Sequence, residues 1–75
     1  MITAEKIQDM IEAALPTATV LVEDPMNDQT HFRATVTSPD FEGKSMVEQH
    51  RMVYAALGNA FDGPLHALQL TTRAK

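Results

Sequence analysis

The sequence contains no cysteine, and this absence excludes several kinds of chemistry. Without a thiol the chain can form no disulfide, no thiolate zinc site and no CxxC redox pair. It also cannot hold an iron–sulfur cluster through sulfur atoms of its own, because such clusters are bound mainly by cysteine thiolates. Any role in metal chemistry must therefore use other side chains, together with ligands that a partner supplies.

Glycine and long apolar runs are also scarce. The three glycines form neither a GxGxxG motif nor a GxxxxGK[ST] phosphate-binding loop. The longest apolar run, residues 52–57, is far too short to span a membrane. No basic segment followed by an apolar stretch opens the chain, so we expect no signal peptide and a cytoplasmic protein. The serines and threonines have no general base at motif spacing, so we expect no enzymatic activity.

Basic residues are fewer than acidic ones. Six Lys and Arg against ten Asp and Glu give a net charge of −4, which argues against strong binding to nucleic acid. The charge is uneven, because residues 1–40 carry two basic and seven acidic side chains, whereas residues 41–75 carry four and three. The second part is therefore the place for an anionic partner, and its cations are Lys44, Arg51, Arg73 and Lys75.

The 75 residues are enough for one domain spanning 1–75, and two segments in it have the apolar spacing of helices. The first begins after Thr3, a good N-cap residue, and ends before Pro16. Its apolar side chains are Ile7, Met10, Ile11, Ala14 and Leu15. The second begins at a capping box of Ser45 and Glu48 and ends near Gly58. Its expected apolar face comprises Met46, Val47, Val53, Tyr54 and Leu57.

Three further segments have the pattern of strands: residues 19–23, 31–38 and 65–72. The turn-rich residues 24–29 predict an antiparallel hairpin of the first two, whereas the helix before the third predicts a parallel pair. The expected fold is α/β, an α+β sandwich of order α-β-β-α-β, with both helices on one face of a three-stranded mixed sheet. In the middle strand Phe32, Ala34 and Val36 should face one way, and His31, Arg33, Thr35 and Thr37 the other. In the last strand, one face should carry His66, Leu68, Leu70 and Thr72.

The three histidines are the candidate metal ligands. His31 and His66 lie at the starts of strands that we expect to be parallel, so both should lie at one edge of the sheet. Two imidazoles there form a possible metal-binding pair, although the alternation places the rings on opposite faces unless the loop bends. Two ligands alone hold a metal poorly, so a partner or small molecule would supply the rest. The alternative is that both are hydrogen-bonded surface residues. His50, on the apolar stripe of the second helix, is expected to be partly buried and structural.

Several segments together resemble the BolA-like family. The family signature is F-E-G-K-S…H-R-x-V-Y-x-x-L…H-A-L. Its counterparts here are Phe41-Glu42-Gly43-Lys44-Ser45, Val47, Gln49-His50-Arg51-Met52-Val53-Tyr54, Leu57, Leu65 and His66-Ala67-Leu68. The resemblance covers essentially the whole chain and includes the order of the elements. It implies a fold similar to class II K-homology (KH) domains.

The resemblance also implies a function. BolA-like proteins pair with monothiol glutaredoxins and share a [2Fe–2S] cluster, in iron sensing or in cluster trafficking. By this resemblance His66 and His31 are cluster ligands, and the glutaredoxin and glutathione supply sulfur. Histidine can replace cysteine on one iron of such a cluster. Some family members are described as transcriptional regulators, so a nucleic-acid-binding regulator of stress response or morphology is the alternative. A homodimer is left open.

Overall fold

The computed structural model describes residues 3–28, 31–58 and 67–74. Its elements follow the expected order, with a short 3-10 helix, η1, in addition. They are α1 (Ala4–Ala14), β1 (Thr19–Glu23), β2 (His31–Ser38), η1 (Pro39–Phe41), α2 (Met46–Leu57) and β3 (Ala67–Ala74). Neither helix in these ranges has the length and apolar character needed to cross a bilayer.

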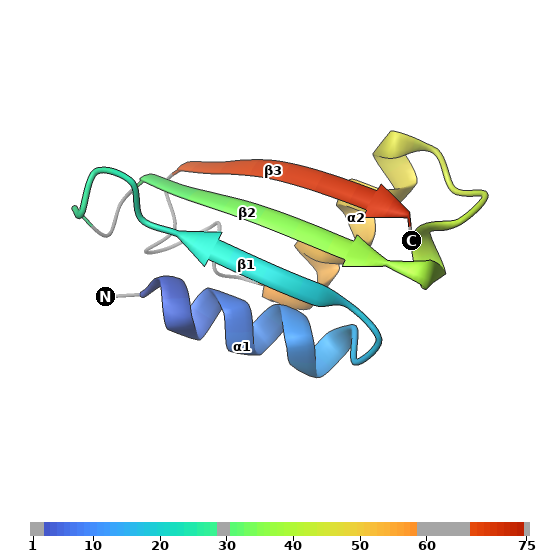
Figure 1. Cartoon of the computed structure of the whole chain (residues 1–75), viewed down its shortest axis with the longest axis horizontal. Helices are drawn as coiled ribbons and strands as arrows, with labels where there is room; N and C mark the ends of the chain where they lie inside the picture. The colour runs from blue at the N-terminus through green and yellow to red at the C-terminus, as the bar shows by residue number, and fades with distance from the viewer. Residues whose placement is uncertain (1–2, 29–30, 59–66, 75) are drawn as a thin grey trace.

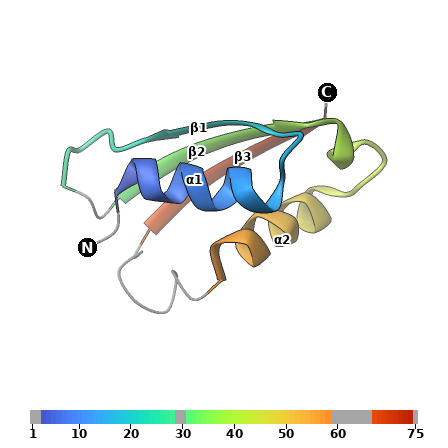
Figure 2. The same cartoon turned by 90° about the horizontal axis from the view of Figure 1, so that it is seen from below.

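The sheet has the order β1-β2-β3, with β2 in the centre (Figure 1). β1 is antiparallel to β2, and β3 is parallel to it, so the mixed sheet is confirmed. Both helices lie on the same face of the sheet, and no described element covers the opposite face (Figure 2). This arrangement leaves the starts of β2 and β3 side by side at one edge.

The core lies between the helices and the sheet. Ile7 and Ile11 of α1 are fully buried in this core, as the apolar spacing predicted. The alternation of β2 is confirmed, because its even-numbered residues are buried and His31 and Arg33 are exposed. Ala14, expected on the apolar stripe, is instead exposed in the last turn of α1. The buried apolar side chains are Ile7, Ile11, Leu15, Val20, Val22, Phe32, Ala34, Val36, Phe41, Val53 and Leu57.

The face that α2 buries differs from the predicted one. Val53 and Leu57 are fully buried, but three members of the expected apolar face are exposed: Met46, Val47 and Tyr54. The buried row instead begins with Gln49, and its members recur every four residues. Val47 and Tyr54 belong to a second row, seven residues apart, on another side of the helix. The sequence therefore offers two partly apolar rows, and packing against the sheet selects one of them.

Gln49 is tolerated in the core because its amide is hydrogen-bonded. Its Nε2 donates to the carbonyl of Lys44 at 2.9 Å and lies 3.5 Å from that of Phe41. The hydroxyl of Thr72 donates to its Oε1 at 2.7 Å. Buried polar groups carry a small penalty when they are paired in this way. The side chain thus joins the loop before α2, the helix and β3.

The predicted ends of the elements hold with two differences. Ser45 caps α2 by accepting from the Glu48 N–H, but its hydroxyl donates to the Glu48 carboxylate, so that carboxylate is not shown to cap a backbone N–H in return. β3 (Ala67–Ala74) continues past its predicted end at residue 72, because its pairing with β2 extends until Ala74 lies opposite Ser38. Leu65 lies outside the described residues. Leu68 and Leu70 pack against the core and Thr72 is buried, which confirms their common face.

Candidate functional site

The candidate site lies at the edge where β2 and β3 begin. His31 is the first residue of β2, and its Cα pairs with that of Ala67, the first residue of β3. His66 directly precedes Ala67 in the chain but lies outside the described residues. The common edge of the two strand starts is therefore confirmed. That the His66 imidazole approaches His31 stays a prediction.

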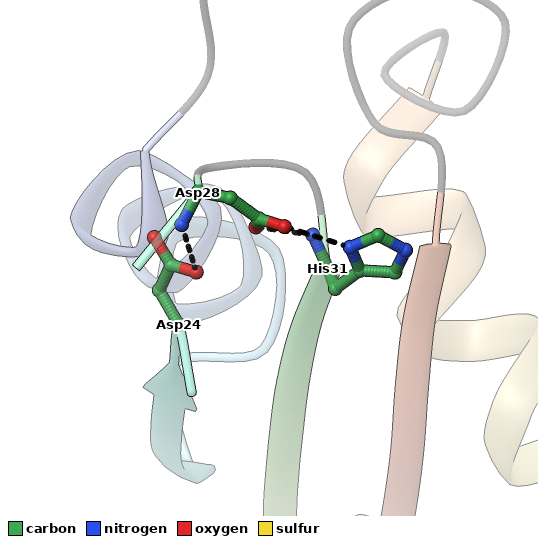
Figure 3. Close-up of polar contacts among 3 residues, drawn as sticks. All are labelled: Asp24, Asp28 and His31. Carbon is green, nitrogen blue, oxygen red and sulfur yellow. Dashed lines mark hydrogen bonds and ion pairs between the residues drawn. The ribbon is translucent and has the colours of Figure 1, made fainter. Parts of the chain in front are cut away.

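The ring of His31 is held by an acidic side chain of the preceding loop. Its Nδ1 lies 2.9 Å from Oδ2 of Asp28, and its backbone N–H donates to Oδ1 of the same carboxylate at 3.1 Å (Figure 3). An ionised carboxylate only accepts hydrogen bonds, so Nδ1 carries a proton in this contact. In the neutral ring Nε2 then keeps its lone pair. Because the side chain is 54% exposed, this nitrogen suits a ligand from outside.

Asp28 is itself positioned by a turn that follows β1. Its N–H donates to Oδ1 of Asp24 at 3.2 Å, and the N–H of Asn27 donates to the Asp24 carbonyl at 3.0 Å. Asn27 has a φ of +53°, in the left-handed region that asparagine tolerates better than most residues. The turn chemistry of residues 24–29 was evident in the sequence. The contact of Asp28 with His31 was not predicted. An aspartate three residues before a histidine at the start of a strand is a sequence feature that could have indicated it.

A hollow of about 470 Å³ lies beside His31. Its walls combine apolar side chains with an imidazole, a guanidinium and an amide: Pro25, Met26, His31, Phe32, Arg33, Leu68 and Gln69. Nε of Arg33 donates to Oε1 of Gln69 across the two strands at 3.4 Å. Met26 is 65% exposed. The hollow has the volume of a small-molecule site and brings together residues from the hairpin loop, β2 and β3.

The described residues offer one histidine ligand at this edge and no complete metal site. Within residues 3–28, 31–58 and 67–74, no group of three or more His, Cys, Asp or Glu side chains could hold a metal ion. An exposed imidazole with a lone pair on Nε2 is chemically able to bind one metal ion through that atom. That His31 does so, together with a second histidine and ligands from a partner, stays a prediction.

His50 is not part of this site. It lies on α2 and is partly buried, as predicted. Its Nε2 is buried and has no hydrogen-bond partner among the described residues, so this nitrogen is closed to an external ligand. The ring meets that of Tyr54 edge-on, with centroids 6.3 Å apart and planes at 77°. His50 therefore serves as a reference histidine for experiments on the other two.

The cations named for nucleic-acid binding lie on separate segments. Lys44 precedes α2, Arg51 lies on α2 and Arg73 lies near the end of β3, and all three are exposed. Lys75 lies outside the described residues. A nucleic-acid-binding surface usually has a basic patch or a basic stripe along one element. The described cations form no such stripe on a single element.

Comparison with known proteins identifies the family. Residues 8–75 match the profile of the BolA-like protein family. The UV-induced protein uvi31 of Schizosaccharomyces pombe is 52% identical over 48 residues, 64% of this chain and 47% of that protein, so the match spans about half of that relative. A bolA protein homologue from Coxiella burnetii has a structure similar to this one, with a TM-score of 0.83 and 39% identity over 99% of this chain and 92% of that one. The BolA domain of SufE1 from Arabidopsis thaliana gives a TM-score of 0.81 and 30% identity over 95% and 90%. The chain belongs to the BolA-like protein family.

Proposed function

We propose that the chain is a non-enzymatic adaptor that pairs with a monothiol glutaredoxin and shares a [2Fe–2S] cluster with it, in iron sensing or cluster trafficking. The observation that carries the proposal is the hydrogen bonding and position of the His31 ring. Its Nδ1 is bonded to Asp28, and its Nε2 is left for an external ligand beside the start of β3. The residue immediately before β3 is His66, the second proposed ligand.

The absence of cysteine determines what this chain can contribute. It would supply nitrogen through His66 and His31, while the glutaredoxin and glutathione would supply the sulfur ligands. When bound, such a cluster is a one-electron redox centre, and histidine ligation raises its reduction potential relative to ligation by thiolates alone. The chain's own residues would orient the imidazoles and form part of the surface that the partner covers.

The hollow beside His31 suits such a partner. A thiolate that shares a small cluster with His31 must come within a few ångströms of it, so the partner would cover the neighbouring walls. Met26 and Leu68 offer apolar contact there, and the guanidinium of Arg33 suits a carboxylate such as those of glutathione. The occurrence of a BolA domain within SufE1 supports a module that can be joined to other protein domains.

The proposal is tested by anaerobic cluster reconstitution on a monothiol glutaredoxin with glutathione, with and without this chain. Visible circular dichroism should change when the chain is present, because two ligands of one iron change from sulfur to nitrogen. Size-exclusion chromatography of the same samples establishes whether a complex forms. An unchanged spectrum in a sample that does contain the complex would contradict the proposal.

Met26→Glu is expected to weaken the complex with the cluster-loaded glutaredoxin by about 10-fold or more. The substitution places a charge in an apolar wall that the partner would desolvate. Leu21→Glu is the matched control, because Leu21 is 55% exposed and lies on β1 outside the hollow. Dissociation constants are measured by titration with each variant. Equal weakening by both variants would exclude the hollow as the docking surface.

The nucleic-acid alternative has less support, because the net charge is negative and Lys44, Arg51 and Arg73 lie on different segments of the described chain. Its test is a mobility-shift titration with duplex DNA at increasing salt. A salt-dependent shift, lost in an Arg51→Ala and Arg73→Ala double variant, would favour the alternative.

A further inference from the structure

We propose that Asp28 is a positioning residue that assigns Nε2 of His31 to the iron. The inference rests on the proposed function, since it concerns the atom through which His31 would bind the shared cluster. Asp28 is not among the residues that carry the family resemblance. Its role follows from the contacts of its carboxylate with His31.

Both oxygens of Asp28 contact the same residue. Oδ1 accepts from the backbone N–H of His31 at 3.1 Å, and Oδ2 accepts from the ring Nδ1 at 2.9 Å. The carboxylate thereby connects the orientation of the imidazole to the first backbone position of β2. The exposed fractions of the two side chains are 54% for His31 and 36% for Asp28. A contact this open to water contributes little to stability, so its main consequence is for the ring itself.

The Asp28 carboxylate determines which ring nitrogen of His31 keeps the lone pair for a metal. In water the neutral histidine side chain favours the tautomer with the proton on Nε2, and that tautomer offers Nδ1 as the metal ligand. The Asp28 carboxylate favours the opposite tautomer, because it can only accept from a protonated Nδ1. The lone pair is then on Nε2, the ring nitrogen farther from the backbone. Carboxylates that hold the other nitrogen of a ligating histidine also raise its basicity.

Asp24 provides a matched control in the same loop. Its Oδ1 accepts from the N–H of Asp28 at 3.2 Å, which the amide oxygen of asparagine can also do. Asp24→Asn therefore removes one negative charge and keeps an acceptor for this bond. Asp28→Asn removes the same charge, but it replaces a group that only accepts with an amide that can also donate to Nδ1.

The first arm of the test uses the isolated chain. Long-range ¹H–¹⁵N correlation spectra in mildly alkaline buffer report which ring nitrogen carries the proton. We expect Nδ1–H at His31 in the natural sequence and in Asp24→Asn, and a shift toward Nε2–H in Asp28→Asn. Nε2–H in the natural sequence, or an unchanged tautomer in Asp28→Asn, would overturn the inference.

The second arm separates this inference from the proposed function. We expect Asp28→Asn to weaken cluster-dependent complex formation with the glutaredoxin by about 10-fold, and Asp24→Asn to leave it within about twofold. His31→Ala should weaken it at least as much as Asp28→Asn. No effect of His31→Ala would contradict the role of His31 in the proposed function. An effect of His31→Ala together with none of Asp28→Asn would overturn the role of Asp28 alone.

Discussion

Phe41→Ala is expected to lower the free energy of unfolding by about 3–5 kcal/mol, the usual cost of removing a buried aromatic side chain. Among the described residues, Phe41 has the largest side chain that is fully buried. A domain of this size has a thin core and a total stability of about 5–15 kcal/mol, so this loss removes a large part of the stability of the fold. Urea denaturation followed by far-ultraviolet circular dichroism measures the loss.

The control is Val47→Ala, because Val47 is apolar but 60% exposed on α2. Its truncation should change the free energy of unfolding by no more than about 0.5 kcal/mol. Its apolar character gave it a place on the predicted buried face of α2, so the same measurement also tests which row of the helix is buried. Comparable destabilisation by the two variants would contradict the packing described here.

Several features of the fold that were predicted correctly depend on local chemistry. The alternation of residues 31–38, the capping serine at Ser45 and the turn after β1 each involve residues close together in the chain. On α2 the burial of Val53 and Leu57 was predicted correctly, but Met46, Val47 and Tyr54 are exposed and Gln49 is buried, because the choice of the buried row depends on distant groups. Gln49 is buried since the carbonyl of Lys44 and the hydroxyl of Thr72 complete its hydrogen bonds. No periodicity in residues 46–57 contains that information.

The candidate site also combines features that the sequence predicted with features that it did not. The common edge of the strand starts followed from the parallel pairing of β2 with β3, and the position of His31 there was predicted. The contact of Asp28 with the ring depends on a left-handed residue at Asn27 and on the rotamer of the histidine, neither of which a sequence pattern specifies. The hollow depends on residues that the fold brings together from positions 25–33 and 68–69.

His66→Ala is expected to abolish the spectroscopic effect of this chain on the glutaredoxin-bound cluster. By the family resemblance His66 is a proposed ligand, and its loss would leave only His31 to bind an iron that the proposal gives two nitrogen ligands. The measurement is visible circular dichroism of the reconstituted mixture, with far-ultraviolet spectra of the variant alone to show that it is folded. The spectrum should equal that of the glutaredoxin and glutathione without this chain.

The other two histidines distinguish ligand loss from a general effect of removing an imidazole. The His31→Ala and His66→Ala double variant should give the same spectrum as His66→Ala, because two ligands of one iron act as a unit and their losses are not additive. His50→Ala should keep the full spectroscopic change, since Nε2 of His50 is buried on α2. A full spectroscopic change in His66→Ala would exclude His66 as a ligand. Loss of the change in His50→Ala as well would show that the effect comes from perturbed docking rather than from coordination.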